Sequence, residues 1–110
     1  MTQRLFVYGT LMPGQPNEQV LTQLAGAWQP ATVQGRLMPQ GWGAALGFPA
    51  LVPAADGEAI RGFVFSSPHL ADFWPTLDAF EGDQYERVLL EAHLDDGSTV
   101  DAFVYALRRG

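Results

Sequence analysis

The chain has 110 residues, of which 47% are hydrophobic, and a formal net charge of −6. This length predicts a single domain, residues 1–110, with one buried core. All six basic residues are arginines that do not cluster with aromatics, and a negative field repels phosphate backbones, which excludes nucleic acid as a partner. The absence of cysteine excludes disulfides and thiolate nucleophiles. Because no apolar run approaches the roughly 20 residues that span a bilayer, we expect a cytoplasmic protein without a membrane partner.

The first part of the chain predicts two strands with a short helix between them. Residues 4–8 form an apolar and aromatic run closed by Gly9, which is typical of a strand covered on both faces. Pro16 is placed to open a helix, whose apolar residues recur at helical spacing until Gly26 stops it. Residues 28–37 alternate loosely and predict a second strand.

The middle of the chain predicts a loop followed by a hairpin. Residues 38–43 carry proline and glycine and are typical of a loop. Residues 48–53 indicate a short strand with prolines at its ends, and residues 59–65 indicate the returning strand. Because Asp56-Gly57 between them is typical of a tight turn, we expect the two strands to pair.

Residues 67–81 predict a helix that is interrupted once. Ser67-Pro68 can cap its start. Apolar residues then repeat at offsets of three and four, namely Leu70, Phe73, Trp74, Leu77 and Phe80. Pro75 removes a backbone donor in the middle, so we expect a break there, with Pro75 opening the principal helix through Phe80.

The last part of the chain predicts its longest hairpin. Val88, Leu90, Ala92 and Leu94 share one face of residues 84–94, and the turn Asp95 to Ser98 leads into a last strand at residues 99–107. Five or six strands with two helices inserted between strand pairs indicate an α+β domain. The surplus of strand over helix favours a curled or barrel-like sheet.

Glu81 is a candidate catalytic residue. It follows Leu77 by four positions and Trp74 by seven, which places it on the apolar stripe of the helix. Burial and the negative end of the helix dipole, with Gly82 as the stop, both disfavour the charged form and should raise its pKa. Such a carboxylate suits a general base. The alternative is a glutamate at a frayed helix end that pairs with an arginine such as Arg87.

The segment Tyr8-Gly9-Thr10-Leu11 is a candidate binding loop. It leaves a strand and leads towards a helix, where backbone N–H groups can bind a carboxylate or an oxyanion if no side chain blocks the approach at Gly9. The alternative is a glycine that only a turn requires.

Other polar residues offer weaker sites. No serine lies in a G-x-S-x-G motif, and His69 and His93 are far apart without paired acidic ligands, so we expect both histidines on the surface and no metal site. Tyr85 and Tyr105 could offer hydroxyls to a pocket or could simply pack. Arg87 could bind a substrate carboxylate, but we expect it on the surface, paired with Glu86 or Glu91.

In order, these motifs resemble the γ-glutamylcyclotransferase-like family, including its γ-glutamylamine cyclotransferase branch. The resemblance covers nearly the whole chain. It runs through Val7-Tyr8-Gly9-Thr10-Leu11, Pro13-Gly14-Gln15-Pro16-Asn17, Phe48-Pro49-Ala50-Leu51-Val52, Leu77-Asp78-Ala79-Phe80-Glu81-Gly82 with Tyr85 and Arg87, and Phe103-Val104-Tyr105.

The resemblance implies a small mixed β-barrel with flanking helices and an enzyme that needs no cofactor. It implies that the substrate's α-amine attacks its own γ-glutamyl carbonyl, which releases 5-oxoproline and an amine or amino acid. Glu81 would be the general base. Tyr8, Gly9, Thr10 and Leu11 would hold the γ-glutamyl group, and Tyr105 would also bind the substrate.

One departure from the family concerns the pocket. Gly62-Phe63 stands where many relatives carry Gly-Glu, which leaves the distal part of the substrate site undefined. Two other functions therefore remain open. One is a binding module that keeps the pocket for a small metabolite without turnover, and the other is a partner protein of a toxin–antitoxin or stress system. The leaving group and the oligomeric state are also open.

Overall fold

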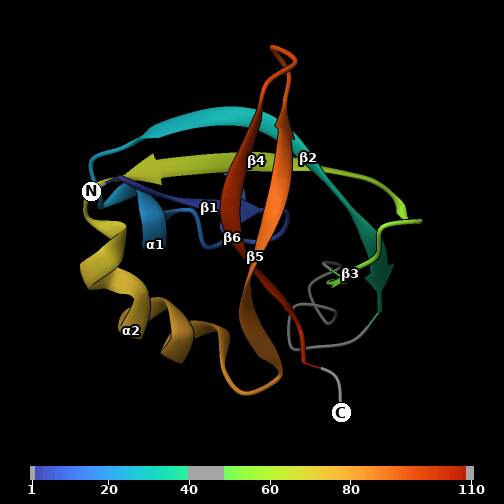
Figure 1. The fold of residues 1–110 in the computed structure, drawn as a ribbon. Helices are drawn as coiled ribbons and strands as arrows, with labels where there is room; N and C mark the ends of the chain where they lie inside the picture. The colour runs from blue at the N-terminus through green and yellow to red at the C-terminus, as the bar shows by residue number, and fades with distance from the viewer. Residues whose placement is uncertain (1, 40–48, 109–110) are drawn as a thin grey trace.

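The computed structural model describes residues 2–39 and 49–108, which form six strands and two helices (Figure 1). In chain order these are β1 Gln3–Val7, α1 Gln19–Thr22, β2 Ala27–Met38, β3 Ala50–Pro53, β4 Glu58–Ser67, α2 Leu70–Glu81, β5 Tyr85–Leu94 and β6 Thr99–Leu107. The predicted loop residues 40–43, and Phe48 of the predicted short strand, lie outside the described residues. Neither helix among the described residues is long and apolar enough to cross a bilayer.

The six strands form one mixed sheet that closes on itself. Its order is β1-β4-β2-β3-β6-β5, and further pairings join β1 to β6 and β2 to β5. The pairs of β6 with β1 and with β3 are parallel, and the other pairs are antiparallel. Five strands are enough to close the ring through these pairings, and the sixth is additional. The α+β class and the small mixed barrel with two helices are therefore confirmed.

The core has two parts, and β1 lies between them. Phe6 belongs to the cluster inside the barrel, together with Val33, Val64 and Val104. Leu5 and Val7 point the other way, into a cluster that includes buried residues from both helices, Leu21, Leu70, Trp74 and Leu77. Because successive side chains of a strand face opposite sides, this arrangement confirms that β1 is covered on both faces.

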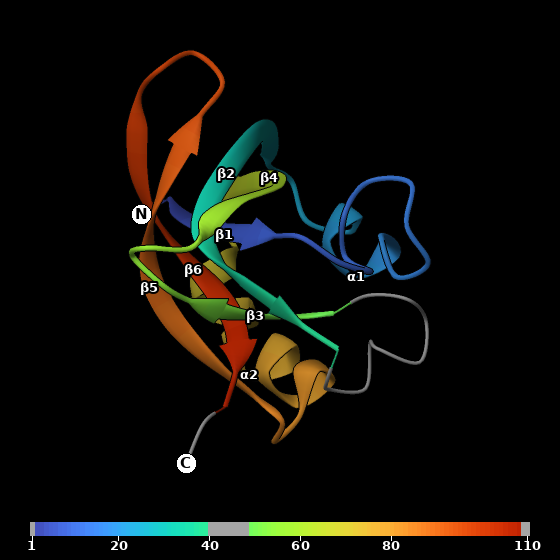
Figure 2. The same cartoon turned by 90° about the vertical axis from the view of Figure 1, so that its right-hand side faces the viewer.

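The predicted C-terminal hairpin is confirmed. β5 and β6 pair antiparallel from Tyr85↔Leu107 to His93↔Thr99. Ala92 and Leu94 are buried on the predicted inner face, whereas Leu89 on the opposite face is 55% exposed. The turn of this hairpin extends away from the barrel, at the end remote from α2 (Figures 1 and 2).

The predicted hairpin between residues 48–53 and 59–65 is wrong. Both segments are strands, but β2 lies between them and pairs with β3 over Gly35–Met38 and with β4 over Ala27–Gly35. The connection around Asp56-Gly57 instead crosses β2 at Gly35. A Cβ on Gly57 would lie 2.4 Å from the Gly35 carbonyl oxygen, so glycine is needed for this close approach.

The expected break at Pro75 is also wrong, because α2 runs without interruption from Leu70 to Glu81. Proline removes the bond that would reach the carbonyl of Ala71. Ala71 and Pro75 are both on the exposed side, where water can satisfy that carbonyl. On the other side Leu70, Trp74 and Leu77 are buried, and their packing holds both halves of the helix in line.

The first helix is short, as expected, but begins at Gln19 rather than at Pro16. Turn hydrogen bonds occupy the preceding backbone, since Asn17 N donates to the Thr10 oxygen at 2.9 Å and Glu18 N donates to the Gln15 oxygen at 3.1 Å. The chain between β1 and α1 is therefore a folded loop.

Candidate active site

Glu81 is the last residue of α2 and lies on its buried face. Leu70, Trp74, Leu77 and Glu81 are the buried residues of this helix, and Glu81 is 8% exposed. Gly82 ends the helix with a φ of 84°, a conformation that favours glycine, and its N–H donates to the Asp78 oxygen at 3.0 Å. The predicted stripe and stop are confirmed, and the side chain is not on the solvated face.

Burial raises the pKa of Glu81 from 4.5 to about 7. The low polarity of its surroundings disfavours the carboxylate relative to the neutral acid. Near neutral pH this group can therefore both accept and donate a proton, which is the property that a general acid or base requires.

The loop after β1 forms the facing wall. Thr10 and Leu11 are buried at 6% and 5% exposure, and Leu11 packs into the core beside the helices. The Gly9 oxygen accepts from Met12 N at 3.1 Å, and the Thr10 oxygen accepts from Asn17 N at 2.9 Å. In a planar trans peptide the N–H points opposite to the C=O. The N–H groups of Thr10 and Leu11 are therefore directed away from these loop bonds.

Tyr8 ties this loop to two strands. Its hydroxyl donates to the Tyr105 carbonyl oxygen at 2.7 Å and accepts from Leu51 N at 2.9 Å. Burial raises the pKa of Tyr8 well above its usual range, the bond from Leu51 N opposes this, and the charges of Glu81 and Tyr85 add to the rise. Tyr8 thus stays neutral and keeps its proton for the bond to β6.

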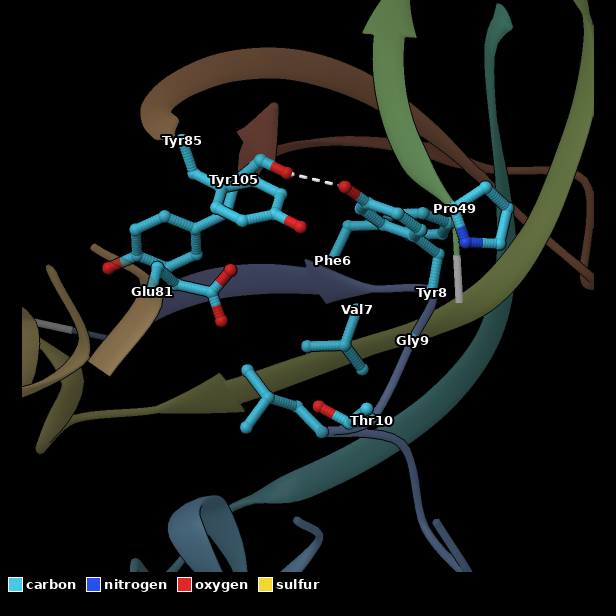
Figure 3. A pocket seen from close by; sticks show the side chains of 10 residues that line it. Phe6, Val7, Tyr8, Gly9, Thr10, Pro49, Glu81, Tyr85 and Tyr105 are labelled. Carbon is cyan, nitrogen blue, oxygen red and sulfur yellow. Dashed lines mark hydrogen bonds between the residues drawn. The ribbon is translucent and has the colours of Figure 1, made fainter. Parts of the chain in front are cut away.

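Glu81 and the loop border one pocket, although some seventy residues separate them in the sequence. Figure 3 shows the Glu81 carboxylate pointing from the end of α2 into this space, with Val7 and Thr10 on the other side. The cavity has a volume of about 50 Å³. Its lining residues are Phe6, Val7, Tyr8, Gly9, Thr10, Leu11, Pro49, Glu81, Tyr85 and Tyr105.

Every residue predicted from the sequence for the site is in this lining, and four further residues were missed. Phe6 and Val7 belong to the buried strand and gave only a packing signal. The sequence indicates Tyr85 only as a possible hydroxyl donor, and its position four residues after Glu81, just past the helix end, is the signal that could have identified it. The sequence predicts Pro49 at the start of a strand, and nothing in its residue type indicates a pocket.

Tyr105 lines the pocket and its carbonyl oxygen accepts from the Tyr8 hydroxyl, while its own hydroxyl is bonded to α2. That hydroxyl donates to Asp78 Oδ1 at 2.6 Å. Arg87 binds the same carboxylate through two bonds, Nε to Oδ1 at 3.1 Å and Nη2 to Oδ2 at 3.3 Å. The guanidinium lies 4.4 Å from the ring centroid of Trp74. The expected pairing of Arg87 with Glu86 or Glu91 is wrong, because Asp78 and Trp74 lie across from it on α2.

The remaining polar candidates lie away from the pocket. His69 and His93 are exposed, as expected, and His93 is near Glu91. Ser67 is buried, where its hydroxyl donates to the Ala25 oxygen at 2.6 Å and accepts from His69 N at 3.0 Å, just before α2. Among residues 2–39 and 49–108, no group of three or more histidine, aspartate or glutamate side chains could hold a metal ion.

The raised pKa of Glu81 predicts a pH dependence of stability. Between pH 4.5 and about 7 the unfolded chain ionises at this position while the folded chain keeps the proton. The contribution of Glu81 to the free energy of unfolding is therefore full below pH 4.5 and is lost as the pH rises towards 7, by up to about 3 kcal/mol at 1.36 kcal/mol per pKa unit. Urea unfolding at several pH values checks this, since Glu81→Gln should lack the decline. Parallel profiles of the two proteins would contradict it.

In this small mixed barrel a buried glutamate and a glycine-bearing loop border one pocket, which is the kind of place where small-molecule sites are found. The family model described as "Gamma-glutamyl cyclotransferase, AIG2-like" matches residues 5–110. The chain therefore belongs to this family. A comparison with curated proteins finds no match.

Solved structures give the same fold. YkqA from Bacillus subtilis is 29% identical with a TM-score of 0.74, and the match covers 98% of this chain but 36% of YkqA, so the chain spans about a third of that protein. An AIG2-like protein from Mus musculus is 26% identical with a TM-score of 0.73, over 96% of this chain and 76% of the mouse chain. A protein from Arabidopsis thaliana is 24% identical with a TM-score of 0.73, over 97% and 62% of the two chains, and shows the fold alone.

Proposed function

We propose that this protein is a γ-glutamyl cyclotransferase that converts a γ-glutamyl amine or γ-glutamyl amino acid into 5-oxoproline. Glu81 is the general base. The observation that carries the proposal is that, in a member of this family, Glu81 and the loop Tyr8 to Leu11 border the same pocket.

In the proposed reaction the α-amine of the γ-glutamyl group attacks its own γ-carbonyl carbon. Glu81 removes one proton from the α-ammonium, and the resulting amine forms the C–N bond that closes the five-membered ring. The protonated Glu81 gives its proton to the departing nitrogen as the bond from that nitrogen to the γ-carbonyl carbon breaks. The attacking nitrogen loses its second proton to the deprotonated Glu81 as it becomes the lactam N–H, and that proton passes on to the released amine, which leaves as an ammonium. A carboxyl whose pKa is about 7 suits both the acceptance and the donation of a proton, because neither protonation state is strongly disfavoured near neutral pH.

The loop supplies binding and charge stabilisation in this proposal. N–H groups of Thr10 and Leu11, directed away from the turn bonds of Gly9 and Thr10, hold a substrate carboxylate or the developing oxyanion. None of the described residues that line the pocket is positively charged, so backbone N–H groups and hydroxyls take the place of an arginine. The ring of Tyr105 borders the γ-glutamyl group.

Most of the rate enhancement would come from holding the substrate folded. A well-oriented intramolecular attack is worth an effective molarity of roughly 10⁵ to 10⁸ M. The walls of Val7, Tyr8, Tyr85 and Tyr105 restrict the substrate to conformations in which its amine approaches the carbonyl. An oxyanion donor from the loop adds on the order of 3 kcal/mol.

The first test is a panel of γ-glutamyl amines and γ-glutamyl dipeptides incubated with the purified protein, with 5-oxoproline measured by mass spectrometry. Release from at least one substrate supports the proposal and identifies the leaving group. If none is released although a panel member binds in calorimetry, the protein is instead the binding module.

The rate should also depend on pH. Because Glu81 must be deprotonated to accept the substrate proton, kcat/KM, which reports the pKa of the free enzyme, is expected to rise with pH through about 7. A pH profile of kcat/KM measures this. A profile of kcat/KM that stays flat between about pH 5 and about pH 8 would contradict a base with this pKa.

A further inference from the structure

Tyr105 is hydrogen-bonded at both of its polar ends, and the two bonds lead to the two walls of the pocket. Its carbonyl oxygen accepts from the Tyr8 hydroxyl at 2.7 Å, which is the loop side. Its own hydroxyl donates to Asp78 Oδ1 at 2.6 Å, which is the α2 side. Asp78 precedes Glu81 by three residues, about one helical turn. One residue of β6 therefore joins the loop to the helical turn that carries the carboxylate.

Each end of this link is itself held in place. On the loop side, the Tyr8 hydroxyl also accepts from Leu51 N at 2.9 Å, which fixes it against β3. On the helix side, Arg87 binds both oxygens of Asp78 and stacks over Trp74, 4.4 Å from the ring centroid. These bonds leave the link little freedom to move as a whole.

Asp78 remains a good acceptor for the Tyr105 hydroxyl. Partial burial opposes its charged form, but the bonds from Tyr105 and Arg87 outweigh this and hold the pKa of Asp78 below its usual range. A hydroxyl bond to a charged acceptor is also stronger than one to a neutral acceptor.

From this arrangement we infer that the Tyr105 hydroxyl is a positioning group, which sets the distance between the Glu81 carboxylate and the loop Tyr8 to Leu11 through its bond to Asp78. The inference rests on the proposed function. The hydroxyl would act on the position of Glu81 and not by touching the substrate, because it is bonded to Asp78.

The physical reason is that apolar contacts alone do not fix the end of α2. Leu77 packs against the core, but apolar packing is not directional, and the bond from Trp74 Nε1 to Gln3 Oε1 at 2.5 Å lies seven residues before Glu81. A hydrogen bond near the C-terminal turn adds direction. A displacement of about 1 Å in a catalytic group can lower a rate by about 10²-fold, so a modest loosening of this turn is expected to be visible in kcat.

The test is a double-mutant cycle of Tyr105→Phe and Asp78→Ala. Tyr105→Phe keeps the ring and the carbonyl oxygen and removes only the hydroxyl. Each single variant is expected to lower kcat by about 10-fold to 100-fold with little change in KM. The double variant is expected to be no slower than Asp78→Ala, because that change removes the acceptor of the Tyr105 hydroxyl together with both bonds from Arg87. Arg61→Gln, which breaks an exposed pair with Asp95 at 3.9 Å, is the control and should keep the wild-type rate.

Two kinetic outcomes would overturn the inference. A raised KM with additive losses means that the Tyr105 hydroxyl contacts the substrate itself. An unchanged kcat with a lower melting temperature means that the bond serves only folding.

A second readout does not depend on activity. The side-chain carboxyl of Glu81, followed by carbon NMR, is expected to titrate near 7 in the wild type and at lower pH in Tyr105→Phe, because a loosened turn gives the carboxylate access to water. Tyr8 and Tyr85 face Glu81 from the loop and from β5 and remain in the variant. If the wild type releases no 5-oxoproline but Glu81 titrates at lower pH in Tyr105→Phe than in the wild type, the proposed function fails. The positioning of Glu81 by the Tyr105 hydroxyl is then still supported. An unshifted titration overturns the link.

Discussion

Replacing Glu81 by glutamine is expected to lower kcat for 5-oxoproline release by about 10²-fold to 10⁴-fold, the range that a positioned general base contributes. Glutamine has nearly the same shape, but it cannot take the proton from the α-ammonium. The fold should persist, because the replacement removes a buried ionisable group, 8% exposed, without leaving a cavity. Steady-state kinetics on the best substrate of the panel, with circular dichroism to verify folding, measure both effects.

Glu91→Gln is the matched control for this prediction. It makes the same chemical change on the outer face of β5, where the Glu91 side chain is 62% exposed. Its kcat should equal that of the wild type. The proposed role of Glu81 is contradicted if Glu81→Gln and Glu91→Gln release 5-oxoproline equally fast.

The second large effect is expected for Gly62→Ala. A Cβ at this position would lie 2.1 Å from the Val7 carbonyl oxygen, where β1 pairs with β4 at Val7↔Phe63. The oxygen belongs to the backbone of β1 and the Cβ would be bonded directly to the backbone of β4, so a strand has to move. We expect a loss of about 3 kcal/mol in the free energy of unfolding, and a rate reduction as well, because Val7 immediately precedes the loop.

Gly97→Ala separates this steric effect from backbone strain. Gly97 has a φ of 92° but no atom within 4 Å of the added Cβ, so the change should destabilise by only about 1 kcal/mol. Urea unfolding of both variants gives the comparison. Equal destabilisation would show that the close approach of β1 and β4 at Gly62 does not control stability.

The position of Glu81 could be predicted because helical periodicity is a local property of the sequence. Trp74, Leu77 and Glu81 follow the same spacing in the sequence and in α2, and Gly82 marks the end as expected. The strand segments could be predicted for the same reason, because alternation and apolar runs can be recognised without knowledge of distant residues.

The partners of the strands could not be predicted in the same way. The turn residues Asp56-Gly57 favour a hairpin, but they do not reveal that β2 is long enough to pair with β3 and β4 on its two edges. That outcome depends on the closure of the whole barrel and on the contact of Gly57 with Gly35. The helix through Pro75 is a similar case, because tertiary packing of the buried face outweighs a local rule.

Contacts between distant elements also limited the prediction of the site. The resemblance to the family made Tyr105 a candidate for substrate contact, but the direction of its hydroxyl depends on Asp78, which lies on another element. The signal for Glu81 is contained in one helix, whereas the pocket walls at Phe6, Pro49 and Tyr85 exist only once the strands have assembled.

The place of β1 in the barrel has a consequence for synthesis of the protein. β1 pairs with β4 and with β6, whose residues 58–67 and 99–107 leave the ribosome long after residues 3–7. The nascent chain therefore carries a strand, ending at Val7, that has two unpaired edges until β4 has emerged and one unpaired edge until β6 has emerged. Such edges promote association with other chains. We expect the glycine-bearing loop to become ordered only after β6 is complete, so that a chain stalled before β6 carries no formed pocket and is prone to aggregate.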